Sequence, residues 1–153
     1  MMSSEMKKGT TKKKMKMVTS NSGDGDVYII NLPYFLKIGK QRYSCNLNGY
    51  RNAHYRVTNA MKKKFKELIT PQVEKLPRFD NPIKIHYKIF YENKRLFDID
   101  NVVSVIAKFS QDALTELGVI PDDNYKHIVQ ITGTFGGVDR DNPRIEMRIK
   151  EVK

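Results

Sequence analysis

Cysteine is nearly absent from this 153-residue chain, which contains only Cys45. One cysteine excludes a disulfide within the chain and any zinc site built from several thiolates. Histidine is also scarce, because His54, His86 and His127 are scattered without the short spacing typical of metal ligands. A lone thiol is most compatible with a reducing compartment, so we expect a cytosolic protein.

Long hydrophobic runs are missing as well. No apolar stretch approaches the roughly 20 residues that span a bilayer, so we expect no membrane partner. The N-terminal lysines are not followed by the apolar segment of a secretory signal. With 153 residues, of which 39% are hydrophobic, the chain is suited to one domain with its own core.

Acidic residues are also few. The chain has 17 of them against 28 lysines and arginines, so its net charge is +11. Residues 1–25 hold six of the lysines, two acids and little to bury, which predicts a flexible basic arm before a folded domain at residues 26–153. An excess of positive charge favours nucleic acid, because cations that neutralise phosphates release condensed counterions. The alternative is that the lysines only maintain solubility, and we favour nucleic acid.

Hydrophobic patterning in the first half of the domain predicts one strand and one helix. The apolar run at residues 27–32 ends at Pro33 and is typical of a strand. Residues 34–56 are ambiguous, with several asparagines and a glycine that indicate turns. A helix is expected from about Thr58, as its N-cap, to about Leu76, with a break or kink at Pro71.

The second half predicts a strand, a helix and two more strands. Residues 83–91 alternate between apolar and polar side chains. An apolar stripe with helical spacing follows Asp100 and is stopped by Gly118. Strands at 126–135 and 145–149 are expected to flank a hairpin loop. The fold class is therefore α+β, a single domain with a mixed sheet and two helices.

Two acidic pairs flank this second helix, with Asp98 and Asp100 before it and Asp122 and Asp123 after it. On an extended segment, Asp98 and Asp100 point to the same side because side-chain direction alternates. Oxygen ligands brought together from two connections suit Mg²⁺, with Mn²⁺ as a substitute. Such an ion neutralises phosphate charge and lowers the pKa of a bound water, which hydrolysis of a phosphodiester needs. Acids for a metal within a basic protein indicate a metal-dependent nuclease.

Each of these residues also has a structural interpretation. An aspartate before a helix is usually an N-cap, which applies to Asp100, and the second acidic pair could simply form a turn. Lys108 could steady a phosphate or be a solvated helix lysine. The other candidates for DNA contact, which could equally be polar surface residues, are Lys94, Arg95, Arg51, His54 and Asn101.

The ordered pattern of Asp98-x-Asp100-Asn101, Lys108 followed by D-A-L at residues 112–114, and then two adjacent aspartates resembles the RusA family of Holliday junction resolvases. These endodeoxyribonucleases occur in bacteria and in phages, and we favour a phage or prophage origin. The resemblance is clearest over residues 95–135. It implies a homodimer with two Mg²⁺-dependent sites whose paired nicks resolve a four-way junction. It also implies catalytic and metal-binding roles for Asp98, Asp100 and Asp123, with Asp122 as a neighbour and Lys108 as the functional lysine.

The chain departs from the family pattern in two places. The family lysine lies one helical turn after D-x-D-N, where this chain has Ser104, and Lys108 comes four residues later. Either Lys108 reaches back towards the helix N-terminus, or the extra turn is absorbed before the helix starts. Phe97 rather than arginine precedes Asp98, and Arg95 is the expected substitute.

Two other functions compete with junction resolution, and the first belongs to a different class. A non-catalytic DNA-binding protein of the same fold would bind junctions without a response to metal. A metal-dependent nuclease acting on flaps or RNA would use the same chemistry on a different binding surface. The complete set of acids argues against the first alternative, and the sequence leaves the second open.

Overall fold

The computed structural model describes Val18–Thr19 and residues 26–153, and its centre is a five-stranded mixed sheet. The strands lie in the order β1 (Val18–Thr19), β2 (Asp26–Pro33), β7 (Arg144–Glu151), β5 (Ile83–Tyr91) and β6 (Ile128–Val138). Neighbouring strands are antiparallel except for β5 and β6, which are parallel. The arm expected at residues 1–25 lies outside the described residues except for β1, which pairs with β2.

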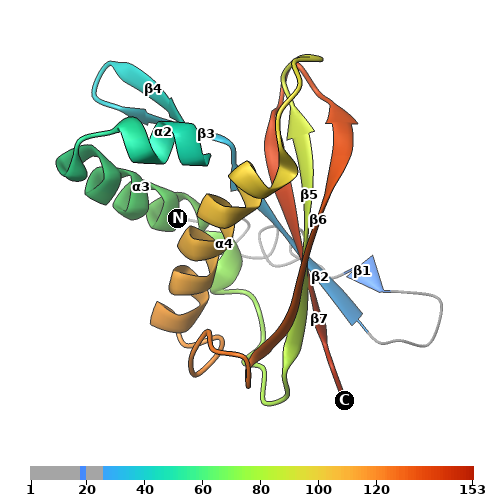
Figure 1. The fold of residues 1–153 in the computed structure, drawn as a ribbon. Coiled ribbons are helices and arrows are strands. Elements are labelled where there is room, and N and C mark those ends of the chain that lie inside the picture. Colours follow the sequence, from blue (N-terminus) through green and yellow to red (C-terminus); the bar gives the residue numbers. More distant parts are fainter. Residues whose placement is uncertain (1–17, 20–25) are drawn as a thin grey trace, which may run out of the picture.

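The remaining elements lie on one side of this sheet (Figure 1). A two-stranded hairpin of β3 (Phe35–Ile38) and β4 (Gln41–Ser44) leads into the short helix α2 (Leu47–Asn52). Two longer helices, α3 (Tyr55–Val73) and α4 (Ile99–Glu116), cover the same face of the sheet. The α+β class and the mixed sheet are confirmed, whereas the described residues form three helices rather than the two expected.

The core forms between the helices and this face because both carry apolar side chains at the required period. Alternate residues of β5 are buried, from Ile83 to Ile89, and β7 buries every second residue in the same way. On α4 the buried stripe includes Phe109, whose ring lies 5.3 Å from that of Phe65 on α3. This packing fixes α4 against both the sheet and α3.

The β5–α4–β6 unit determines where the end of α4 lies. Because β5 and β6 are parallel, the chain crosses back along α4, whose N-terminus therefore follows the C-terminal end of β5. The helix approaches β6 closely at Gly133, where a Cβ atom would lie 2.7 Å from Cγ2 of Val103. Only a glycine permits this approach, which holds the first turns of α4 next to the sheet.

The expected hairpin between the last two strands is wrong. Residues 136 and 137 lie within β6 rather than in a loop, and β7 pairs with β2 and β5 instead of β6. The physical reason is that alternation specifies which face of a strand is buried but not which strands become its neighbours.

The helix boundaries also differ from expectation. The N-cap of α3 is His54 rather than Thr58, and the helix continues past Pro71 to Val73. Pro71 lacks a backbone N–H, but only two helical residues follow it, so the helix ends just beyond the proline instead of breaking at it. The N-cap of α4 is Asp98, which places Asp100 inside the first turn. Gly118 has a φ of 79°, as expected for a residue that stops a helix.

Among the described residues, none of the helices has the length and apolar character needed to cross a membrane.

Candidate active site

Asp98 and Asp100 lie together at the start of α4, at the C-terminal end of β5. Asp98 has the extended backbone of an N-cap, yet its side chain makes no capping hydrogen bond. Both residues are exposed, and neither carboxylate has a hydrogen-bond or ion-pair partner within the described part of the chain. The capping interpretation therefore does not account for Asp98, and both carboxylates are available to an outside ligand.

This arrangement fits a divalent cation. Two exposed carboxylates on one turn offer the hard oxygen ligands that Mg²⁺ prefers, and Mg²⁺ retains several waters, so few protein ligands are needed. The positive end of the helix dipole stabilises the negative charges of the two carboxylates while they are without a cation.

The second acidic pair lies at the opposite end of α4. Helix α4 has 18 residues, which at 1.5 Å per residue is roughly 27 Å of helix axis. Residues 26–153 contain no group of three or more His, Cys, Asp or Glu side chains gathered as a metal site. A single chain therefore does not bring Asp122 and Asp123 to Asp98 and Asp100, contrary to the expectation that the two connections meet.

The two aspartates of this second pair differ in their surroundings. Oδ1 of Asp122 accepts a hydrogen bond from the Asp123 amide at 2.8 Å, and its Oδ2 accepts from Nδ2 of Asn124 at 3.0 Å. These bonds give Asp122 a structural role in the turn. The carboxylate of Asp123 is exposed and makes no hydrogen bond to other described residues, so it is the member of the pair that can bind a ligand.

Lys108 lies on the exposed side of α4, further from the acids than the family pattern implies. Helix α4 is unbroken from Ile99, so the extra turn is inside the helix and was not absorbed before its start. Lys108 is eight residues beyond Asp100, roughly 12 Å along the axis. Ser104, at the family position, donates its hydroxyl to the Asp100 carbonyl at 2.6 Å. Lys108 shares one helical stripe with Ser104 and Asn101.

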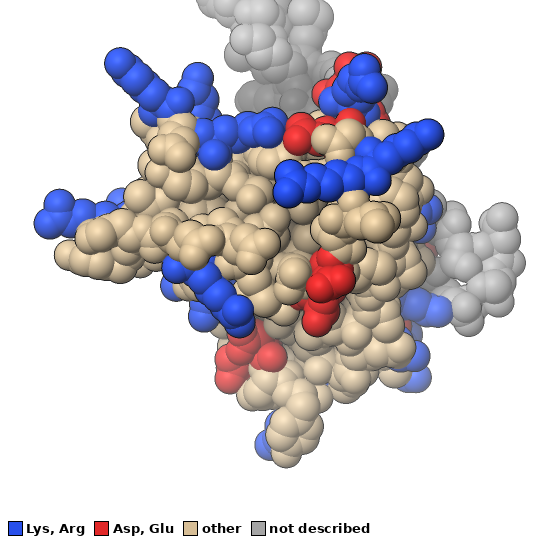
Figure 2. Space-filling model, turned by 45° about the horizontal axis from the view of Figure 1, so that its top comes forward, with Lys and Arg blue, Asp and Glu red and all other residues tan. Residues whose placement is uncertain are grey.

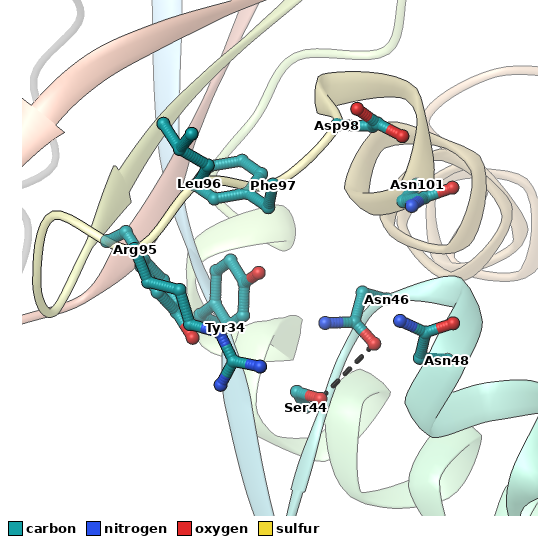
Figure 3. A pocket seen from close by; sticks show the side chains of 10 residues that line it. Tyr34, Ser44, Asn46, Asn48, Arg95, Leu96, Phe97, Asp98 and Asn101 are labelled. Carbon is teal, nitrogen blue, oxygen red and sulfur yellow. Dashed lines mark hydrogen bonds between the residues drawn. The ribbon is translucent and has the colours of Figure 1, made fainter.

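A pocket of about 510 Å³ opens beside Asp98 and contains two of the expected DNA-binding residues, Arg95 and Asn101. Lys94 lies outside it, next to a smaller apolar cavity near Phe135 on β6. Figure 3 shows the Arg95 side chain and the Asn101 amide on different sides of the pocket. The segment before α4 and the first turn of α4 thus bring a cationic and an amide group to the pocket beside the carboxylate of Asp98.

The sequence did not predict the opposite wall of this pocket. That wall comes from the boundary of β2 and β3, the end of β4 and the start of α2. Burial raises the pKa of one wall residue, Tyr34, to about 12, against the opposing effect of a hydrogen bond with Asn46. The only sequence signal there was a set of turn-forming asparagines, and the four residues it failed to identify as site residues are Tyr34, Ser44, Asn46 and Asn48.

Arg51 and His54 do not line this pocket. His54 caps α3, its Nδ1 accepting from the Arg56 amide at 3.1 Å, and its ring lies 4.4 Å from that of Tyr55. Arg51 is exposed in the last turn of α2. The structure therefore gives His54 a structural role and places Arg51 on the surface near the joint of α2 and α3.

Figure 2 brings forward the top of the view in Figure 1, where α4 begins. Figure 2 shows Lys and Arg side chains projecting along the upper edge of this face, with the acidic side chains in a few separate patches. Lysines and arginines near separate acidic patches attract a polyanion while leaving the carboxylates exposed for metal binding.

Residues 37–150 match the family model described as Endodeoxyribonuclease RusA, which covers most of the chain and every candidate site residue named from the sequence. The chain belongs to the RusA family. It is therefore an endodeoxyribonuclease of the Holliday junction resolvase class, which hydrolyses phosphodiester bonds. RusA nucleases are generally dependent on divalent metal. No curated protein matches the chain at a significant level.

Proposed function

We propose that this RusA protein is a Mg²⁺-dependent endonuclease that resolves four-way DNA junctions by paired nicks, with Mn²⁺ as an alternative ion. The observation that carries the proposal is the pair of unpartnered carboxylates, Asp98 and Asp100, at the start of α4. Asp98 also lines a polar pocket, and the protein has a net charge of +11.

The residues around the pair have separate roles in this proposal. Asp98 and Asp100 hold the metal, which when bound neutralises phosphate charge and lowers the pKa of water. Arg95 lines the pocket next to Asp98 and binds a phosphate that flanks the cut. Lys94 and Arg51 are exposed cations that contact the DNA backbone further out. These contacts orient the substrate, while the carboxylates fix where hydrolysis occurs.

The proposal includes a homodimer in which each site is shared between subunits. One chain holds its two acidic pairs at opposite ends of α4. If Asp123 is a ligand, as the family pattern implies, it must come from a second copy. In a twofold dimer the exchange is reciprocal, so two equivalent sites form together. Two sites related by a twofold axis match the symmetry of a four-way junction and of paired nicks.

Cleavage of a labelled four-way junction, compared with a linear duplex of the same sequence, tests this function. We expect paired nicks in the junction with Mg²⁺ and no nicks with EDTA. Tight junction binding without cutting under Mg²⁺ or Mn²⁺ would instead favour a non-catalytic binding protein. Preferential cutting of a flap or of RNA at equal enzyme concentration would show that the chemistry is correct and the substrate is not.

Lys108 is proposed to bind a DNA phosphate beside the acidic pair. Side chains on a helix lean towards its N-terminus, so the ammonium group is directed towards the stripe containing Asn101 and Ser104. Replacing Lys108 with alanine should weaken junction binding and reduce the slope of log affinity against log salt by about one, as for the loss of one phosphate contact. Fluorescence anisotropy across a series of salt concentrations measures both quantities.

Two further variants separate this role from packing. Lys108→Arg should restore the salt dependence because it restores the charge. Lys63→Ala serves as the control, since Lys63 is exposed on α3 and has no assigned role. An unchanged salt slope for Lys108→Ala would identify Lys108 as a solvated surface lysine.

A further inference from the structure

The pocket beside Asp98 has a size and location that the acidic pair alone does not explain. Its volume is about 510 Å³, within the range of small-molecule binding sites. The segment before α4 and the first turn of α4 form one wall, and the β4–α2 connection forms the other (Figure 3). A phosphate held at Asp98 would place its neighbouring nucleotide at the mouth of this pocket.

The wall formed by the β4–α2 connection is held in place by its own hydrogen bonds. Oδ1 of Asn46 accepts from the Gly49 amide at 2.8 Å and from the Ser44 hydroxyl at 3.2 Å. A Cβ at Gly49 would lie 2.4 Å from the Ser44 carbonyl oxygen, so this turn requires glycine. The Cys45 amide donates to the Tyr34 carbonyl at 2.7 Å. The wall is thus formed before any ligand binds, which reduces the entropy lost on binding.

Two amide side chains face the pocket without partners of their own. Asn48 is exposed at the start of α2, Asn101 lies in the first turn of α4, and neither side chain makes a hydrogen bond to another described residue. Figure 3 shows both extending towards the same space as Asn46. An amide offers two donors and an acceptor, the combination that pairs with the edge of a nucleobase. A site for phosphate alone would be expected to present donors only.

Aromatic and apolar side chains also line the pocket, as stacking of a base requires. Phe97 lines the pocket, and its ring lies 5.2 Å from that of Tyr91, another lining residue. Leu96, at the rim, is 94% exposed between Arg95 and Phe97. Several DNA-bending proteins insert an exposed apolar side chain, such as leucine, as a wedge between neighbouring bases. Leu96 is therefore in position to occupy the space left by a base that enters the pocket.

We propose that this pocket receives one unpaired nucleotide next to the phosphate to be cut, and that Asn48 and Asn101 contact its base. A duplex is too wide for the pocket, so the nucleotide must leave the base stack, which costs least where pairing is already interrupted. The inference rests on the proposed junction resolution, because the junction centre supplies such nucleotides. It makes Asn48 a specificity-determining residue, through which the base beside the cut is recognised.

Mapping of cleavage positions on a junction with a mobile centre tests this proposal, because the mobile centre presents many sequences to the site. Asn48→Ala should reduce the ratio of cutting at preferred and disfavoured positions by roughly fivefold or more, the usual effect of losing a good base contact. The affinity for the junction should change by less than about twofold, since the phosphate contacts remain. Asn52→Ala, one turn further along α2 and outside the pocket, should leave the cleavage pattern unchanged. An unchanged pattern for Asn48→Ala would overturn the proposal.

A second measurement does not depend on cleavage. Single-stranded deoxytrinucleotides are added to ¹⁵N-labelled protein in EDTA, and the side-chain amide signals of Asn46, Asn48, Asn101 and Asn52 are followed by NMR. We expect the first three to shift by amounts that depend on the base, and Asn52 to stay in place. Shifts that are the same for every base would indicate a phosphate site, and no shift would exclude the pocket as a nucleotide site. Either result refutes base recognition without bearing on junction cutting, whereas base-dependent shifts without any cutting would refute the proposed function alone.

Discussion

Replacing Asp98 with asparagine is expected to lower junction cleavage by at least roughly a hundredfold, because a metal ligand contributes several kcal/mol of transition-state stabilisation. The substitution should not harm folding, since the Asp98 side chain is exposed and makes no capping hydrogen bond. Junction binding should be unchanged or tighter, because one negative charge is removed from the surface that meets the phosphates. Cleavage and gel-shift assays on one labelled junction measure both effects.

A matched control separates catalysis from a general loss of charge. Asp26 is also an exposed aspartate, but it lies on β2, two strands away from β5. Asp26→Asn should cut the junction at the wild-type rate. Weaker junction binding by a folded Asp98→Asn protein, or cleavage within tenfold of wild type, would remove Asp98 from the metal site.

The hydrophobic pattern of the sequence was sufficient to predict the helices and strands that bury one regular face. The apolar stripe from Val102 to Leu117 defined α4, and the alternation from Ile83 to Tyr91 defined β5. The same pattern was not sufficient to predict the order of the strands in the sheet. Ile145, Met147 and Ile149 indicate that β7 has one buried face, but an edge strand and a central strand with one buried face have the same pattern. The position of β7 between β2 and β5 is decided by long-range packing.

In the candidate site, too, the local motif could be predicted from the sequence and the long-range contacts could not. The Asp98–Asn101 motif was recognisable because its residues are adjacent in sequence. The pocket wall was not, because β3, β4 and α2 are too short to show a period, and distant contacts such as the one between Cys45 and Tyr34 hold them in place. The separation of the acidic pairs, by contrast, was implicit in the sequence, since any continuous helix between Asp100 and Gly118 must hold them apart.

Because the two acidic pairs lie at opposite ends of α4, we expect two inactive variants to recover cleavage when they are combined in one dimer. Asp98→Asn and Asp123→Asn proteins should each fail to cut a junction, whereas dimers containing one copy of each should nick it. In such a dimer, one site combines both substitutions and the other combines Asp98 with Asp123 of the partner subunit, both unchanged. Random exchange of subunits should therefore restore about a quarter of the wild-type sites, as expected for reciprocal sites in a twofold dimer. Co-expression of two differently tagged chains, followed by purification through both tags, yields the mixed dimer alone.

The products of the mixed dimer and one further pairing make this result specific. With a single functional site, the mixed dimer should leave single nicks, and paired nicks that resolve the junction should be rare. A mixed dimer of Asp98→Asn with Asp100→Asn should remain inactive, because both changes affect the same end of α4 and each site keeps one of them. If every site were built within one chain, the Asp98→Asn and Asp123→Asn pairing would be equally inactive. Full activity of Asp123→Asn by itself would instead remove Asp123 from the site and leave the pair at the start of α4 to hold the metal.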